Sequence, residues 1–442
     1  MPETSAEEKQ KLDGLLQADA ADAPAAIPLG QLDGLVNVLD AVRRSGPCSR
    51  GEVASRTGLS RAVVSQRIIE LMKRGLVEEG EFGVSSGGRM PRLLRFRANA
   101  GHLLVAALGA TSSSVALTDL SGTVLDYERE PIEIADGPEI VLNRVRQVFR
   151  ELQSRRGAVE SPWGIGVGIP GPVEFSTGRP VAPPIMPGWD QFGIREHFAE
   201  FDAPVWVDND ANLLALGEAT AGVGRGHDTM LFIKIGTGIG AGLIINGRLH
   251  RGAQGCAGDV GHIQVVDDAN IICRCGNVGC LEAIAGGGAI ARLAAEGTEA
   301  GKSSLLKELH AERGALTTAE VGWAASHGDH FSVEMIGNVG HIIGHALASL
   351  VNVLNPSVIV IGGGVSLVGD LLLASIREAI YGRSLPLATR SLLIQRTSLG
   401  DRGGVIGAAA LVADQLFARR VLSVWTTSGH PIGNPGLASI DA

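Results

Sequence analysis

One histidine and three cysteines lie close together in the chain and have the side chains of a metal site. His262 is followed, after ten intervening residues, by Cys273, Cys275 and Cys280 in the segment GHIQVVDDANIICRCGNVGCLE. Three thiolates and one imidazole form a donor set typical of a closed, tetrahedral structural zinc site. The alternative is that these cysteines are buried, reduced thiols without a metal, but the tight clustering of the three cysteines favours zinc. The sequence therefore predicts a Zn²⁺ ion that orders a loop with little hydrophobic reason to fold.

The other residues around this cluster fit the same interpretation. Gly276 and Gly279 would let the chain turn tightly enough to bring Cys280 back to the metal. Cys48 and Cys256 lie outside the cluster and are predicted to be ordinary small residues. Five cysteines with this spacing do not suggest a disulfide framework.

Two glycine-rich segments share the pattern of a strand, a Gly/Thr turn and a second strand. They are LLVAALGATSSSVALTDLSGTVL from residue 103 and MLFIKIGTGIGAGLIINGRL from residue 230, the second ending in the hairpin signal Asn246-Gly247. Such loops are used to hold phosphates. Glycine-rich hairpins are also common by chance, but the duplication favours two related lobes that face a cleft. The first strand reaches its turn with Ala107, where a loop that handles phosphate and metal would need a carboxylate.

Charge is distributed unevenly along the chain. Residues 41–97 contain 12 Arg and Lys and five Glu, a net charge of +7, whereas the remainder has 26 basic and 42 acidic residues, a net charge of −16. A basic module on an acidic body confines nucleic-acid contact to the N-terminal part. We expect no membrane span and a cytoplasmic protein, because no run of about 18 uncharged apolar residues and no signal-peptide core occurs.

The basic module has the pattern of a winged helix–turn–helix domain. After a first amphipathic helix, SRGEVASRTGLSRAVVSQRIIELMKRG predicts a short helix, a turn at Gly58 and a longer helix capped by Ser60. In the longer helix Val64, Ile68 and Leu71 would face inward, leaving polar side chains for base edges in a major groove. The wing would be formed by the segment LVEEGEFGVSSGGRMPRLLRFR. The alternative role for such a domain is docking to another protein. The predicted DNA contacts are Arg61, Ser65, Gln66, Arg67, Arg89 and Arg92.

The rest of the chain alternates short apolar strands with longer helical stretches. Examples are WGIGVGIPG, APVWVDND and PSVIVIGGG, which indicate an α/β layered body. The composition agrees, with 45% hydrophobic residues, 19% charged residues and 61 glycines. The sequence predicts a flexible leader over 1–30, the winged helix–turn–helix over 31–98, the two-lobed body over 99–420 with its cleft near 209–262, and an irregular tail over 421–442.

Several motifs together resemble those of the ROK family of bacterial sugar kinases and sugar-responsive repressors. They are GTGIGAG, AGDVGH, CRCGNVGCLE, VDNDAN and NPSVIVIGGGV, and the basic module with SSGGRMPRLLRF resembles the winged helix of the repressor members. The resemblance extends from about residue 33 to 418. It implies an actin-like, hexokinase-type ATPase fold, a sugar site in the cleft between two lobes, and assembly into a homodimer or homotetramer.

The resemblance also implies roles for individual positions. Asn209 and Asp210 match the family's sugar-contacting pair, and Asp210 matches the general base of kinase members, since a carboxylate can take a proton from a sugar hydroxyl. His262 matches a zinc ligand that also points toward the sugar. Asp259 and Glu282 match further carboxylates of the sugar site. The nucleotide-loop positions are Gly109, Thr111, Gly236, Thr237, Gly238 and Gly363.

Three positions depart from the family pattern. Ala107 stands where kinase members have an aspartate, which argues against phosphoryl transfer and makes ATP and Mg²⁺ unexpected as cofactors. Asp259 replaces a glutamate, and Ile185 replaces a common asparagine, so the usual sugar preference is not expected to hold.

Three functions are compatible with these observations. The first is a DNA-binding transcriptional regulator, expected to be a repressor, that senses a sugar or sugar derivative through a body without kinase activity. The second is an ATP-dependent sugar kinase, similar to ROK glucokinases, with an added DNA-binding domain. The third is a DNA-binding regulator without a small-molecule ligand. The sugar-sensing regulator is the prediction, because it accounts both for the basic module and for the absence of a carboxylate at position 107.

Overall fold

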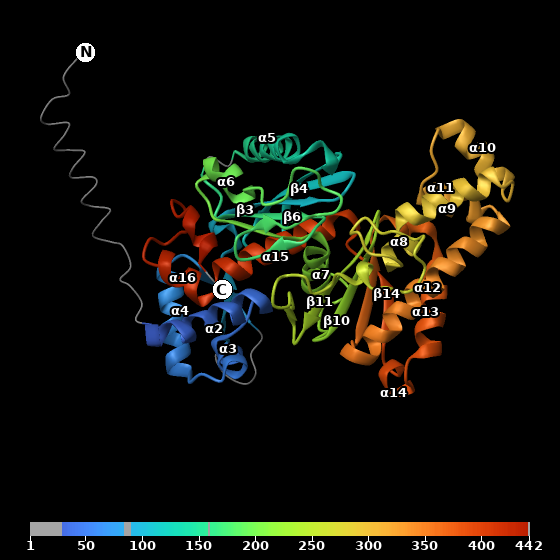
Figure 1. Ribbon diagram of the computed structural model, residues 1–442. Helices are drawn as coiled ribbons and strands as arrows, with labels where there is room; N and C mark the ends of the chain where they lie inside the picture. Colours follow the sequence, from blue (N-terminus) through green and yellow to red (C-terminus); the bar gives the residue numbers. More distant parts are fainter. Residues whose placement is uncertain (1–28, 84–89, 158–159, 441–442) are drawn as a thin grey trace, which may run out of the picture.

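The computed structural model describes residues 29–83, 90–157 and 160–440, which form a small N-terminal domain and a body of two lobes (Figure 1). Of the predicted leader, only residues 29 and 30 fall within the described part, and they begin the first helix. The predicted order of a winged helix–turn–helix followed by a two-lobed α/β body is confirmed.

The N-terminal domain has three helices and a two-stranded antiparallel wing. Ser49 and Glu52 form a capping box at the start of the second helix, and Gly58, with φ of +70°, ends that helix. The side chain of Ser60 accepts the amide of Val63 and so begins the third helix as predicted. The elements are α2 (Leu29–Ser45), α3 (Arg50–Thr57), α4 (Arg61–Lys73), β1 (Val77–Phe82) and β2 (Arg92–Phe96).

The apolar face of α4 is buried as the sequence predicts. Val64, Ile68 and Leu71 are fully buried against α2 and the wing. Their hydrophobic cluster continues without interruption into the first lobe of the body. The winged-helix domain therefore shares a core with that lobe and is not joined to it by a linker alone.

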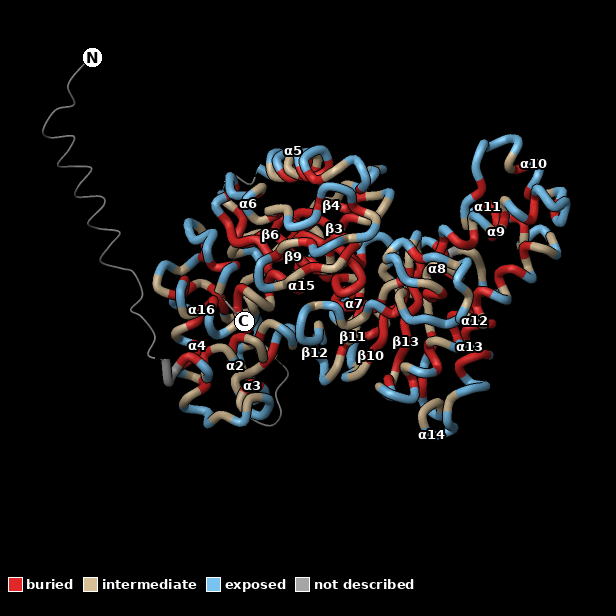
Figure 2. The backbone as a smooth tube through the Cα atoms, viewed as in Figure 1, coloured by how far each residue is buried: buried red, intermediate tan, exposed pale blue. Residues whose placement is uncertain are grey.

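The first lobe is built on a five-stranded sheet with the order β5-β4-β3-β6-β9. Successive residues of the central strand face opposite sides: Leu104 and Ala106 pack on the side of α5, Leu103 and Val105 on the side of α15. The sheet is thus covered on both faces, as Figure 2 shows. The elements are β3 (His102–Leu108), β4 (Ser112–Asp119), β5 (Val124–Pro131), α5 (Pro138–Arg156), β6 (Gly164–Ile169), the short hairpin β7 (Val173–Glu174) and β8 (Arg179–Pro180), α6 (Ile194–His197), β9 (Val205–Asn209) and α15 (Gly403–Leu416).

The second lobe repeats this plan with the sheet order β12-β11-β10-β13-β14. In both sheets a central strand pairs antiparallel with the next strand along the chain and parallel with a later one. The predicted duplicated lobes are therefore confirmed. The elements are β10 (Met230–Ile235), β11 (Ile239–Ile245), β12 (Arg248–Leu249), α8 (Leu281–Ala285), α9 (Gly287–Glu299), α10 (Ser304–Arg313), α11 (Thr318–Ser326), α12 (His330–Leu354), β13 (Val358–Gly362), α13 (Asp370–Arg383), α14 (Pro386–Thr389) and β14 (Leu393–Arg396).

Two helices, α7 (Asp210–Ala221) and α15, lie between the sheets (Figure 1). They cross so closely that a Cβ on Gly407 would stand 1.7 Å from the carbonyl oxygen of Leu213. A helix crossing at this distance needs glycine, because any side chain would enter the neighbouring backbone.

Helix α12 is the one helix in the described part of the chain that is long and apolar enough to cross a membrane, judged by length and composition only. Its buried residues, among them Ile336, Val339, Ile343 and Leu347, form one face that packs in the second lobe's core. This packing accounts for its apolar composition.

The irregular tail predicted over 421–442 is wrong for its first part. Residues Arg419–Trp425 form helix α16, and Pro435–Ser439 form a 3₁₀ turn. Trp425 is fully buried, packs edge-on against Trp163, and donates its indole N–H to the carbonyl of Leu416 at 2.9 Å. Tertiary packing therefore orders the start of a segment that is predicted from sequence to be irregular.

Candidate functional site

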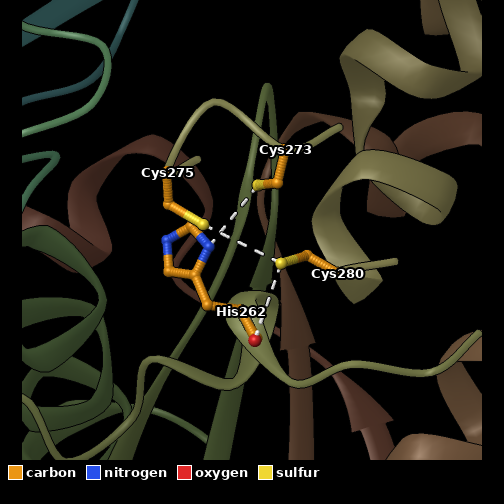
Figure 3. A group of neighbouring side chains, drawn as sticks. All are labelled: His262, Cys273, Cys275 and Cys280. Atoms are coloured by element: carbon orange, nitrogen blue, oxygen red, sulfur yellow. Dashed lines mark hydrogen bonds between the residues drawn. The ribbon is translucent and has the colours of Figure 1, made fainter. Parts of the chain in front are cut away.

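The predicted metal ligands converge in the second lobe (Figure 3). The Sγ atoms of Cys275 and Cys280 are 3.8 Å apart, Cys273 Sγ is 3.7 Å from His262 Nδ1, and all four ligand atoms lie within 4.8 Å of one another. Thiolates about 2.3 Å from a tetrahedral zinc would be about 3.8 Å apart. The donor set and its spacing therefore fit a four-coordinate metal ion, and the cluster can hold one.

Local backbone geometry brings the four ligands together. His262 ends a 3₁₀ turn, and isolated bridges join Gln264 to Cys280 and Ile272 to Val278, so the loop folds back on itself. Gly279 has φ of +67°, and a Cβ there would lie 1.8 Å from the carbonyl oxygen of Val266. The tight turn expected at Gly279 is thus required by the backbone and by the close approach of the segment that contains Val266.

The thiols differ in acidity when no metal is bound. Burial, with the neighbouring thiols adding to it, raises the pKa of Cys280 to about 12, and burial also raises the pKa of Cys273. For Cys275 burial acts in the same direction, but hydrogen bonds from the Asn277 backbone and the other two thiols outweigh it and lower the pKa. Binding of a divalent cation would release the remaining protons, so acid competes with metal here.

The predicted sugar-contacting pair lies where β9 ends and α7 begins. Asn209 caps α7 by accepting the amide of Ala211 at 2.9 Å, and its Nδ2 donates to the carbonyl of Gly171 at 3.0 Å. Asp210 is buried and forms an ion pair with Lys234 from β10. The same helix start therefore presents an amide and a carboxylate that are both held in fixed orientations.

A second ion pair, between Asp208 and Arg251, holds the end of β9 in place. Asp208 is 2% exposed and accepts from Arg251 Nε at 2.8 Å and from Asn212 Nδ2 at 2.8 Å. The guanidinium of Arg251 also stacks on Phe175, 3.9 Å from the ring centroid. These contacts fix β9 to the loop that follows β12.

The remaining predicted sugar residues come from the second lobe. Glu282, on α8, accepts the amide of Ile239 at 3.0 Å. Asp259 precedes the 3₁₀ turn that carries His262. Asp259 keeps access to solvent, yet partial burial raises the pKa of its carboxyl group, and the charge of Glu282 adds to this while His262 opposes it. The five residues thus form two groups on opposite lobes, Asn209 and Asp210 on one, Asp259, His262 and Glu282 on the other.

The second glycine loop is a tight turn held by its own backbone and by the start of α9. Gly236 donates to the carbonyl of Gly238 at 2.8 Å, and the loop carbonyls accept amides from the start of α9. Thr237 is exposed at its tip. Gly363, with φ of +88°, packs on the same loop, since a Cβ there would lie 2.4 Å from the carbonyl of Ile235.

The first glycine loop keeps its shape without its carboxylate. Gly109 donates to the carbonyl of Ser112 at 2.8 Å, and Thr111 is exposed. Ala107, two residues earlier, packs against the first turn of α15, where a Cβ on Gly404 would stand 2.6 Å from the alanine methyl. Ile185, another departure from the family pattern, packs at the edge of the first lobe's core.

The predicted DNA-contacting residues do not all lie where the sequence placed them. Arg61 and Gln66 are exposed and Ser65 is half-buried at the N-terminal half of α4. Arg92 is exposed on the wing, where it pairs with Glu79 at 3.3 Å and lies over Phe82. Arg89 lies outside the described residues.

Arg67 is a correction, because it is buried and not on the exposed face. It stands three residues after Val64 and one before Ile68, so helical spacing places it on the face that packs against α2. A Cβ on Gly34 would lie 3.5 Å from its Nε, and the absence of that side chain leaves room for the guanidinium.

Lys234 and Arg251 are site residues that the sequence analysis missed. Lys234 is the one charged residue in the apolar strand MLFIKI, and this interruption is the signal that could have identified it. Arg251 follows the Asn246-Gly247 hairpin, and no local pattern predicts its pairing with Asp208.

A winged helix–turn–helix fused to a two-lobed body with paired glycine loops and a Cys₃His cluster is the architecture of a transcriptional regulator built on a sugar-kinase-type fold. The chain belongs to the ROK family, whose model matches residues 105–415, and the MarR family model matches residues 36–83.

Individual relatives divide into kinases and repressors. The chain is 36% identical over 310 residues to a glucokinase of Halalkalibacterium halodurans, covering 70% of this chain and 94% of the glucokinase. It is 32% identical over 380 residues to the xylose repressor of Caldicellulosiruptor bescii, covering 84% and 92%. A crystal structure of a ROK family transcriptional regulator, homologous to the E. coli MLC protein, matches 91% of this chain and all of its own, with 26% identity and a TM-score of 0.76. The repressors thus match a longer part of the chain than the glucokinase does.

Proposed function

We propose that this protein is a repressor of sugar-metabolism genes that binds operator DNA through α4 and the wing, and senses a sugar or sugar derivative in the cleft. The observation that carries the proposal is the winged helix–turn–helix that shares a core with the first lobe of a ROK body. The alignment with the xylose repressor, which includes both parts, supports it. Such a regulator acts in the cytoplasm as a homodimer or homotetramer, and a symmetric assembly would read two half-sites.

In this proposal the two groups of polar residues hold the ligand between the lobes. Asn209 and Asp210 would contact hydroxyl groups from one side, and Asp259, His262 and Glu282 from the other. A ligand that touches both lobes has different affinities for open and closed arrangements, and only such a difference can shift the population between them. The Cys₃His cluster would hold a structural Zn²⁺ that fixes the orientation of the His262 loop.

Ligand binding is the first expected result. Thermal unfolding against a panel of sugars and sugar phosphates should show one compound that stabilises the protein, because a ligand at about 100 times its Kd adds about 2.7 kcal/mol. Asp210→Asn should lower the affinity for that compound at least about tenfold, since a neutral amide replaces the carboxylate that accepts its hydrogen bonds.

Glu308→Gln is the matched control, because Glu308 is exposed on α10 and its amide variant leaves both lobes of the cleft unchanged. The stabilising compound should then change the affinity of the protein for duplexes selected from a random-sequence pool. A protein that binds such DNA and is stabilised by no compound in the panel would contradict the sensor proposal and favour the ligand-independent regulator.

The second candidate is an ATP-dependent sugar kinase, favoured by the similarity to a glucokinase over the whole body. Lys234 and Ala107 oppose it. The Lys234 ammonium forms an ion pair with the Asp210 carboxylate, which would have to act as the general base. Ala107 supplies no charge to position the metal ion or the γ-phosphate. We therefore propose that the body has lost phosphoryl transfer.

Kinase activity tests this loss directly. The wild-type protein with Mg²⁺-ATP should phosphorylate none of the compounds that stabilise it. Ala107→Asp should fold, because residue 107 faces the first turn of α15 and a carboxylate is favourable near a helix N-terminus. This variant should gain stabilisation by Mg²⁺-ATP that the wild type lacks. Turnover by the wild type at rates ordinary for kinases, about 1 to 100 per second, would overturn the proposal.

A further inference from the structure

We propose that helix α15 carries the state of the cleft to the winged-helix domain, and that Asp414 is the positioning residue that couples the two. This inference rests on the proposed function, because it assigns a route to the regulation of that same site. It follows from three sets of contacts: the start of α15 with α7, Asp414 near its end with two arginines of α2, and the segment around α16 with α2 and the end of α4 (Figure 1).

The first set joins the start of α15 to the helix that bears the ligand residues. Asp210 begins α7, and Glu218 stands near the end of the same helix. Glu218 is fully buried, and its carboxylate accepts the amides of Ser398 and Leu399 at 3.0 and 3.2 Å and the hydroxyl of Thr397. These three residues lead from the second lobe's sheet into α15. A movement of α7 relative to the second lobe must therefore displace the start of α15.

Close backbone packing makes that contact stiff. A Cβ on Gly217 would lie 2.2 Å from the carbonyl oxygen of Gly403, the first residue of α15. No side chain separates the two helices at this point, so neither can slide without moving the other. The helices behave as a single crossed unit between the lobes.

The second set joins the end of α15 to α2. Asp414 accepts from Arg43 at 2.5 Å and from Arg44 at 2.9 Å, and the Arg43 side chain is only 10% exposed. Phe417, directly after the helix, packs edge-on against Phe96 of the wing at 5.6 Å and lies under the Arg43 guanidinium. One carboxylate thus holds two arginines of the DNA-binding domain, and a buried guanidinium has few alternative partners.

The third set extends this attachment to the recognition helix. Arg74, which follows α4, has a fully buried side chain and donates Nε–H to the carbonyl of Thr426 at 3.2 Å. Arg419 of α16 pairs with Asp33 of α2 at 3.0 Å. The segment after α15 therefore grips both α2 and α4. A rotation of α15 would turn α4 with it. In an oligomer this would change the distance between the α4 helices that bind the two half-sites.

Asp414→Asn tests the coupling, because it removes the charge that holds both arginines and keeps the shape of the side chain. Asp40→Asn is the matched control, since Asp40 contacts Arg43 at 3.3 Å from within α2 and does not cross between domains. Asp414→Glu is the conservative variant that should restore the coupling. Each protein is measured for ligand affinity by calorimetry and for affinity toward a selected DNA duplex with and without saturating ligand.

The expected result is that Asp414→Asn binds the ligand with unchanged affinity, while the ligand changes its DNA affinity less than about twofold. The wild type, Asp40→Asn and Asp414→Glu should all keep the full response, for which allosteric proteins typically show a factor of about 5 to 150. A full response in Asp414→Asn would overturn the inference.

Failure of the proposed function gives a different pattern, in which the wild type itself does not respond to any ligand. Hydrogen exchange then still decides the inference. Without ligand, Asp414→Asn should exchange the amides of α2 and β2 faster than the wild type, with unchanged exchange in α12 of the second lobe. Equal protection of α2 in the two proteins would show that Asp414 does not hold the winged-helix domain.

Discussion

Cys275→Ser is expected to lose the Zn²⁺ ion proposed for the Cys₃His cluster and to destabilise the second lobe. A serine hydroxyl is a poor zinc ligand, and only three donors would remain of the four that lie within 4.8 Å. We expect the zinc content of the variant, measured by atomic spectroscopy, to fall below about one tenth of that of the wild type. Loss of a structural metal is among the few single changes that cost on the order of 4 kcal/mol, so the unfolding temperature should fall as well.

Cys256→Ser is the control for this experiment, because Cys256 is exposed and lies outside the cluster. It should keep both metal content and stability. Metal content should also depend on pH in a defined direction. Burial raises the pKa of Cys273 and Cys280, so protons compete with the metal for these thiolates, and zinc should be released as the pH falls. Full metal content in the Cys275→Ser variant would show that the Cys₃His cluster is not the metal site.

The convergence of the Cys₃His cluster was predictable from sequence because its four residues are close in the chain and chemically distinctive. Cys273, Cys275 and Cys280 need only a local loop and two glycines to meet. The duplicated lobes were predictable for a similar reason, since each hairpin is a local pattern that occurs twice. The assignment of Asn209 and Glu282 to a sugar site rests on the family resemblance, because nothing in their local sequence predicts a shared ligand.

The errors came where tertiary packing decides the outcome. Arg67 is predicted from sequence to lie on the exposed face of α4, whereas helical spacing puts it beside Ile68 against α2. Lys234 lies in an apolar strand, and its partner Asp210 belongs to a different element of the fold. The order of α16 depends on Trp163 and Leu416, which are distant from it in sequence or belong to another helix. Local propensity carries no information about such partners.

Loss of the exposed polar side chains of α4 should have the largest effect on DNA binding. Gln66 and Arg61 are exposed near the start of the helix that follows the turn at Gly58, the position that meets base edges in winged helices. Gln66→Ala should lower affinity for the selected duplex by about 1–3 kcal/mol, roughly 5- to 150-fold, and should relax preference at one base pair. Titration of labelled duplexes with fluorescence anisotropy measures both.

Salt dependence separates base contacts from phosphate contacts on the same helix. Arg61→Ala should reduce the slope of log affinity against log salt by about one if Arg61 binds a phosphate, and should leave the slope unchanged if it reads a base. Lys73→Ala is the matched control, because Lys73 is exposed in the last turn of α4, away from the predicted groove. Equal reductions of the salt slope in Lys73→Ala and Arg61→Ala would mean that Arg61 contributes only its charge. Unchanged DNA affinity in Gln66→Ala and Arg61→Ala together would move the winged-helix domain from a DNA-binding to a protein-docking role, since the fold is compatible with both.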